Sequence, residues 1–232
     1  MNNFVAPMNH SYIFNKALAI LGIFALGVFI NWFPLVFVRI PWPQDEIIRP
    51  VTDALWQTVT TIFIPVTWAI WRLGLKPADM GLTLNNLGKT TLLGCALYTL
   101  ALVSFIHCSD DPLIAKNLLR NVDTVDAIIL TSSMSLVAAG TDIATRGFIL
   151  LTLARYTNVW FAIVVQNLTW YLGHIHEIGL LENCLGYYQA LGLTLTLGLL
   201  GDAIALRTRN VIGLSIAHIL LNVVMVSYMR HL

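Results

Sequence analysis

Charged residues are scarce in this chain of 232 residues: Asp, Glu, Lys and Arg make up 11% of it, whereas a soluble domain carries about 25%. Hydrophobic residues make up 57%, and the mean hydropathy is +0.76. The few charges separate apolar runs of about 18 residues or more. The composition therefore excludes an ordinary soluble domain and predicts a protein that crosses the membrane several times.

The chain also lacks a run of basic residues and has a net charge of only +1, so nothing in it predicts nucleic acid as a partner. Its three cysteines, Cys95, Cys108 and Cys184, form neither a metal motif nor a disulfide framework. We expect free thiols, with a Cys108–Cys184 pair as the one alternative if both lie on the same membrane side. No A-x-A cleavage site follows the first apolar run, so we expect a retained first helix.

Apolar segments predict about seven membrane helices, with six to eight as the range, in one all-α domain over residues 1–232. The expected helices are Ala17–Val38, Val51–Trp71, Leu87–Ile106, Ala127–Ala154, Val159–Leu172, Tyr187–Leu206 and Val211–Met229. Pro65 is expected to kink the second helix, and residues 173–186 to form a loop or a broken helix. A short surface helix is expected around Leu113–Leu119. We find no internal repeat.

Basic residues predict the orientation in the membrane. With seven spans, one side carries the larger set: Lys16, Arg72, Lys76, Lys89, Arg155, Arg207 and Arg209. The other side carries Arg39, Arg49, Lys116, Arg120 and Arg230. Because the more basic side normally faces the cytoplasm, we expect a cytoplasmic N-terminus.

Polar residues inside apolar segments are the candidates for a functional site. The run LVAAGTDIATRGFILLTLA, residues 136–154, contains Asp142 and Arg146, which are one helical turn apart and can neutralise each other. A charge in hydrocarbon costs about 2.5–3.5 kcal/mol on insertion scales, so such residues serve a site or lock helices together as an ion pair. Two later segments carry pairs with the same spacing: Trp170 with His174, and His218 with Asn222.

A metal site is the weaker interpretation of the polar residues after the fifth helix. His174, His176 and Glu177 lie close together in the sequence, but they do not form His-Glu-x-x-His. Imidazoles at positions i and i+2 of a helix point about 200° apart and share a metal only if the helix breaks. We therefore predict no cofactor, with a divalent metal such as Zn as the less favoured alternative.

Small residues on the sixth expected helix allow other helices to approach closely. They are Gly192, Thr194, Thr196, Gly198 and Gly201. Packing inside the protein is favoured over an oligomer contact, and the oligomeric state stays open.

Three of these motifs together resemble the CAAX-protease and bacteriocin-processing (CPBP) family of intramembrane proteases. That family has Glu-Glu-x-x-x-Arg, Phe-x-x-x-His and His-x-x-x-Asn on separate membrane helices. The matching stretches here are Thr141-Asp142-x-x-x-Arg146, Trp170-x-x-x-His174 and His218-x-x-x-Asn222. The resemblance runs from about Ser135 to the C-terminus, and it implies a catalytic core at about residues 127–229.

The resemblance implies hydrolysis of a hydrophobic or membrane-anchored peptide inside a bacterial inner membrane, as in bacteriocin maturation or self-immunity. It further implies that His174 helps a carboxylate to activate water, and that His218 and Asn222 bind the oxyanion. Arg146 and Asp142 would form the ion pair of the first motif. Nothing in the sequence points to a prenyl group.

One departure from the family pattern bears on activity, because Thr141 stands where the family has its first Glu. A threonine hydroxyl is not a base near neutral pH, and Asp142 is turned about 100° from position 141 on a helix. Three alternatives stay open. Asp142 is the base if the helix is distorted near Gly140, Glu177 supplies the carboxylate, or the chain is a non-catalytic member that binds peptides or acts as an immunity protein.

Two further considerations concern geometry and function class. At 1.5 Å per residue, the expected helix ends place His218 about 10 Å and His174 about 25 Å from the cytoplasmic edge, which conflicts with one shared site. A small transporter or proton relay would also use buried Asp, Arg and His. The chain lacks the repeated halves with paired broken helices that are typical of such proteins.

Overall fold

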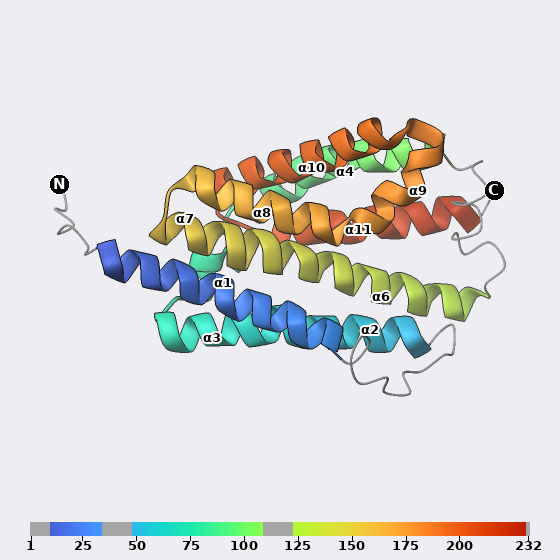
Figure 1. Ribbon diagram of the computed structural model, residues 1–232. Coiled ribbons are helices and arrows are strands. Elements are labelled where there is room, and N and C mark those ends of the chain that lie inside the picture. Colours follow the sequence, from blue (N-terminus) through green and yellow to red (C-terminus); the bar gives the residue numbers. More distant parts are fainter. Residues whose placement is uncertain (1–9, 34–47, 109–122, 231–232) are drawn as a thin grey trace.

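The computed structural model describes residues 10–33, 48–108 and 123–230, and over these ranges it is an elongated bundle of helices without strands (Figure 1). The expected all-α bundle is confirmed. The α-helices are α1 His10–Phe33, α2 Ile48–Thr58, α3 Ile64–Leu73, α4 Leu87–His107, α6 Thr124–Asp142, α7 Thr152–Tyr156, α8 Val159–Gly173, α9 Ile175–Leu185, α10 Tyr187–Thr208 and α11 Ile212–Arg230. The surface helix expected around Leu113–Leu119 lies outside the described residues.

Among the described residues, four helical runs are long and apolar enough to cross a membrane: Phe14–Trp32, Leu87–His107, Thr124–Tyr156 and Tyr187–Thr208. Two shorter apolar helices, Val159–Gly173 and Ile212–Ser227, pack beside them. Each of the seven expected segments is helical, to within a residue, over its described part. Large apolar side chains such as Trp71, Leu92 and Tyr188 lie exposed on the outside of the bundle. The protein is an integral membrane protein.

Two π-helical segments interrupt the long helices. The segment η2, Val59–Phe63, comes just before Pro65, which has no N–H to give to the helical ladder. The segment η4, Ile143–Leu151, begins directly after Asp142, inside the helix expected from Ala127 to Ala154. The expected run is therefore helical but not a continuous α-helix, and π segments inside helices are frequent at functional sites.

The stretch after α8 is a broken helix and not a loop. The chain breaks at His174 and continues as α9, which packs back towards the end of α4. Cys108 and Cys184 form a disulfide there, 76 residues apart in sequence. The expectation of free thiols is wrong for this pair because α9 brings Cys184 to Cys108 within one small apolar cluster, and Cys95 alone stays free.

The turn before α11 is buried. Asn210 is fully buried, and its side-chain amide donates to the carbonyls of Thr83 and Asn85 at 2.7 and 2.6 Å. The N–H of Val211 donates to the Gly81 carbonyl at 2.9 Å. The loop that precedes α4 therefore covers the start of α11.

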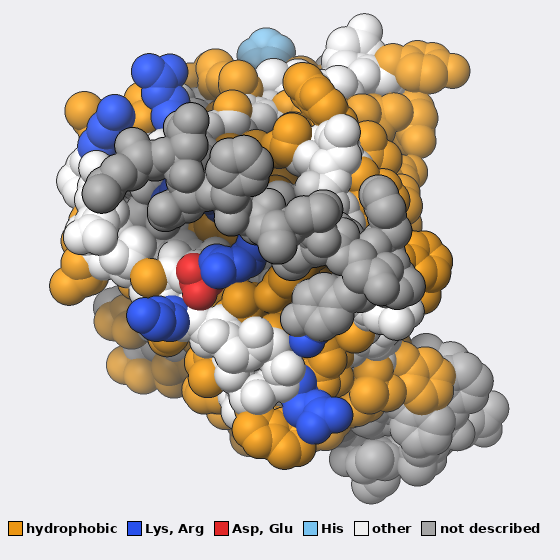
Figure 2. Space-filling model, turned by 90° about the vertical axis from the view of Figure 1, so that its left-hand side faces the viewer, with side chains coloured by type: hydrophobic (Ala, Val, Ile, Leu, Met, Phe, Trp, Pro, Cys, Tyr) orange, Lys and Arg blue, Asp and Glu red, His pale blue; other side chains and the backbone are white. Residues whose placement is uncertain are grey.

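Basic side chains gather at the end of the bundle where α1 and α4 begin and where α3, α7 and α10 end. These residues are Lys16, Arg72, Lys76, Lys89, Arg155, Arg207 and Arg209. Figure 2 looks onto this end and shows Lys and Arg side chains spread over it, with an acidic side chain beside one of them. We call this the basic end, and the Cys108–Cys184 disulfide lies at the opposite end (Figure 1).

Asp79 fixes a short 3₁₀ helix, η3 Pro77–Met80, at the basic end. Its Oδ2 accepts the Lys76 N–H at 2.8 Å, and its Oδ1 accepts from Arg155 Nη1 at 2.6 Å. The bond from Lys76, aided by Arg155, holds the pKa of the Asp79 carboxyl below its usual range.

We expect Asp79→Asn to lower the free energy of unfolding by about 0.5–1 kcal/mol at neutral pH, because the pair is partly exposed. The folded-state pKa is depressed, so this stabilisation is present above the unfolded pKa and disappears as the pH falls through the folded pKa. Thermal unfolding of both proteins in detergent, at pH 7 and at about pH 2.5, measures this. A difference that persists undiminished in acid would contradict it.

The disulfide gives a direct prediction. In denaturant without reductant, a maleimide should label one cysteine per chain, and after reduction it should label three. Replacing Cys108 and Cys184 together by Ser should lower the free energy of unfolding by about 2–4 kcal/mol. Cys95→Ser is the control, and labelling of three thiols before reduction would refute the pair.

Candidate active site

Asp142 lies at the centre of the buried polar cluster. It is fully buried at the end of α6. The Tyr98 hydroxyl lies 3.1 Å from each of its carboxylate oxygens, and His218 Nδ1 lies 3.2 Å from Oδ2. Arg146 Nη1 forms an ion pair with Oδ1. Every face of this carboxylate is thus occupied by a hydrogen-bond donor.

Arg146 lies in the π segment and is also fully buried. Besides Asp142, its Nε lies 3.6 Å from Asp202 Oδ1, and its Nη2 donates to the Leu197 carbonyl at 3.3 Å. The guanidinium carbon lies 4.0 Å from the centre of the Trp170 ring, a cation–π distance. A single cation thus joins η4 to α8 and α10.

The aromatic and imidazole rings form a stack beside this cluster. Trp170 stacks on His174 with ring centres 3.9 Å apart, and its centre lies 6.4 Å from that of His218. His218 also stacks on Tyr98 at 4.4 Å. The two histidines therefore lie at one site, both against the Trp170 ring, and the separation expected from the helix ends is wrong.

The other residues of the three motifs differ in how they are engaged. Asn222 is buried one turn beyond His218 on α11. Thr141 is partly buried, and its hydroxyl donates to the Val137 carbonyl of its own helix at 2.9 Å. His174 is partly buried, with Nδ1 2.8 Å from the Trp170 carbonyl oxygen. Its Nε2 makes no hydrogen bond within the described part of the chain.

Glu177 lies in the first turn of α9, three residues after His174, and its charge acts on that imidazole. Its Oε2 is buried and has no hydrogen-bond partner among the described residues. His176, by contrast, is exposed. In the described ranges no three His, Cys, Asp or Glu side chains gather as metal ligands would.

Sequence reasoning missed three members of the cluster. Asp202 on α10 is buried, and its Oδ2 accepts from Asn167 Nδ2 at 2.7 Å. Both are polar residues inside apolar helices, so the rule that singled out Asp142 applies equally to them. Tyr98 on α4 carries no such pattern, because an aromatic residue in an apolar helix is ordinary.

The small residues of α10 make room for this cluster. A Cβ on Gly201 would collide with the Arg146 guanidinium, and a Cβ on Gly198 would collide with Asn167 Oδ1. A Cβ on Gly192 would meet nothing within 4 Å. At the first two positions, the expectation of packing inside the protein is confirmed.

This arrangement has the parts of a hydrolytic site inside a membrane. Two imidazoles lie against the Trp170 ring, and a buried ion pair contacts the imidazole of His218. The charge of Glu177 acts on the other imidazole, and a buried amide, Asn222, lies one turn beyond His218. Such groups can move protons and stabilise a developing negative charge.

The comparison with protein families agrees with this class. Residues 124–224 match the family model described as type II CAAX prenyl endopeptidase Rce1-like. This match agrees with the resemblance to the CPBP family of intramembrane endopeptidases that the three motifs predict. No curated protein and no solved structure matches the chain.

Close packing against Arg146 gives a testable contrast on one helix. Gly201→Ala should lower the free energy of unfolding by about 1–3 kcal/mol, because the added methyl group displaces the guanidinium. Gly192→Ala should be neutral or stabilise the helix by about 0.5–1 kcal/mol. Unfolding of both variants in mixed micelles measures the contrast, and equal effects would show that Gly201 is not in contact with Arg146.

Proposed function

We propose that this protein is an intramembrane endopeptidase that hydrolyses a hydrophobic or membrane-anchored peptide with an activated water molecule. The observation that carries the proposal is the position of His218, held by the Asp142 carboxylate and by the Tyr98 ring next to Trp170 and His174. The family match over residues 124–224 supports the same reaction class.

His218 and Asn222 are assigned to the oxyanion. In this assignment His218 acts as an imidazolium, which donates from both ring nitrogens. Nδ1 lies 3.2 Å from the Asp142 carboxylate, and Nε2–H is the donor to the oxyanion. Asn222, one turn further along α11, supplies an amide donor. Preorganised donors of this kind stabilise the tetrahedral intermediate of peptide hydrolysis.

Glu177 is the carboxylate best suited to take the proton from water. Asp142 is engaged by Arg146, Tyr98 and His218, and the Thr141 hydroxyl is bonded to its own helix. Glu177 has a buried oxygen without a partner among the described residues, beside His174. In this assignment His174 holds the water and Glu177 accepts its proton.

A second candidate function is peptide binding without hydrolysis, as in an immunity protein. It is favoured by Thr141, which puts a hydroxyl where the family has its first Glu. The same site would then bind a peptide and leave it intact. Cleavage measurements separate the two functions.

We also propose a bacterial inner membrane as the location, with the basic end and the N-terminus in the cytoplasm. Two features support this orientation independently. The basic end carries the larger set of Lys and Arg. The Cys108–Cys184 disulfide lies at the opposite end, and disulfides persist in oxidising compartments.

The test is cleavage of a labelled hydrophobic peptide library by the purified protein in lipid. We expect the wild type to cut, and His218→Ala to be at least about 100-fold slower because it lacks an oxyanion donor. Glu177→Gln should be slower by a similar factor, because the base is removed. His176→Ala and Glu182→Gln are matched controls, since both residues are exposed on α9.

The outcomes separate the proposals. If the wild type does not cut but Thr141→Glu does, the chain is a binding protein on a protease scaffold, and the second candidate holds. If Glu177→Gln is as active as the wild type, the assignment of Glu177 is wrong. Full activity of His218→Ala would rule out the proposed site.

A further inference from the structure

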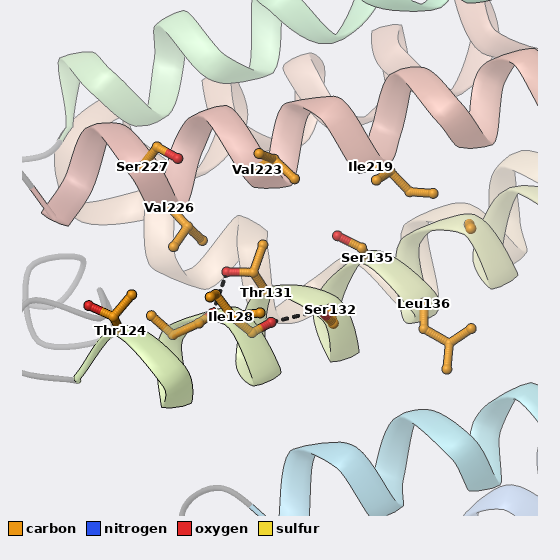
Figure 3. Close-up of a pocket in the computed structure, with 12 residues that line it drawn as sticks. Thr124, Ile128, Thr131, Ser132, Ser135, Leu136, Ile219, Val223, Val226 and Ser227 are labelled. Atoms are coloured by element: carbon orange, nitrogen blue, oxygen red, sulfur yellow. Dashed lines mark hydrogen bonds between the residues drawn. The ribbon is translucent and has the colours of Figure 1, made fainter.

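A groove runs between α6 and α11 and leads to the candidate active site. It is lined by α6 from Thr124 to Ala139 and by α11 from Ile219 to Ser227, and its volume is about 830 Å³ (Figure 3). Binding sites for small ligands have volumes of about 300–1,000 Å³. None of its lining residues is charged, so it fits an uncharged occupant.

The inner end of the groove adjoins the site. Ile219 directly follows His218, and the Ala139 carbonyl lies 3.4 Å from the Ser215 hydroxyl of α11. The outer end, at Thr124 and Ser227, lies at the end of the bundle opposite the basic end (Figure 1). A chain in the groove would therefore reach His218 from that opposite end.

The lining is not a plain apolar wall. Hydroxyl groups of Thr131, Ser132 and Ser135 lie along α6. Those of Thr131 and Ser132 donate back to the carbonyls of Ala127 and Ile128 at 2.6 and 2.7 Å. An acyl or isoprenoid chain offers no hydrogen bond to any of these hydroxyl groups, whereas a peptide backbone offers a donor and an acceptor at every residue.

Ser135 points most directly to a ligand. It is 8% exposed, its Oγ has no hydrogen-bond partner among the described residues, and it projects towards α11 (Figure 3). Leaving a buried hydroxyl unpaired costs free energy. A backbone amide or carbonyl that passes along the groove would satisfy it.

We propose that this groove binds an extended, uncharged segment of the peptide substrate. The substrate then approaches the site from the end of the bundle opposite the basic end. The inference rests on the proposed endopeptidase function. Between Thr124 and Ala139 the helix rises about 22 Å, so an extended segment of about six residues fills the groove. The substrate is thus a hydrophobic peptide with free backbone amides, and its cleaved bond lies beyond that segment.

Photo-crosslinking tests the occupant. A benzophenone amino acid replaces Ser132, which lines the groove, or Met134, which is exposed but is not part of the lining. Both changes are made in the full chain with His218→Ala, so that binding is measured without cleavage. The probe is a biotinylated peptide of about 20 Leu, Val and Ala residues, long enough to enter a bilayer.

We expect the Ser132 position to crosslink the probe at least about fivefold more than the Met134 position, and excess unlabelled peptide to abolish the difference. Equal crosslinking at both positions would overturn the proposal. Equal competition by palmitate or farnesol would also overturn it, because the groove would then bind lipid chains. These readouts do not depend on catalysis. If the wild type cleaves the peptide but the Ser132 position does not crosslink it, the proposed groove is refuted and the protease function stands. If the Ser132 position crosslinks the peptide but the wild type does not cleave it, the protease function is refuted and the groove stands.

The role of Ser135 is tested by affinity. Ser135→Ala should weaken binding of the probe about 2- to 10-fold, the loss of one hydrogen bond. Ser133→Ala is the matched control, because the Ser133 hydroxyl bonds the Ile129 carbonyl and is not part of the lining. Intact Cys108–Cys184 linkage on non-reducing gels checks that both variants fold, and equal affinities of the two would contradict the proposed contact.

Discussion

The bundle depends on the burial of one cation, the Arg146 guanidinium. It has no contact with solvent, and two carboxylates, a carbonyl and an indole ring surround it. Removal of one partner from a buried ion pair costs about 3–5 kcal/mol, because the remaining charge is left without compensation. Helices α6, α8 and α10 are therefore constrained to meet at one point, and the imidazoles are placed relative to that point.

Backbone geometry follows from the same constraint. The chain leaves the ordinary α-helix directly after Asp142 and returns to it at Thr152. Within this π segment Arg146 pairs with Asp142 on its own helix and still reaches Asp202 on α10. Gly201 has no side chain at the point of closest approach. Neighbouring helices thus share a polar cluster that none of them could bury alone.

Much of this could be predicted from the sequence, for identifiable reasons. Apolar runs fix the helices, and paired polar residues one turn apart mark Asp142, Arg146 and His218, because polar groups are costly in lipid. The π segment and the buried turn before α11 could not be predicted, and the Cys108–Cys184 disulfide could be named only as the less favoured alternative. Each of them depends on contacts between distant segments. The role of Tyr98 could not be predicted for the same reason. Its hydroxyl contacts the Asp142 carboxylate only because α4 packs beside that residue.

Helix α4 lies outside the segment that matches the family model, yet it supplies Tyr98 to the Asp142 carboxylate and Cys108 to the cross-link with α9. The structural unit that builds the site therefore extends beyond residues 124–224, which match the family model. A fragment cut at residue 124 would keep all three sequence motifs and lose both the Tyr98 contact and the disulfide. Any transplant of this site into another membrane scaffold has to carry α4 with it.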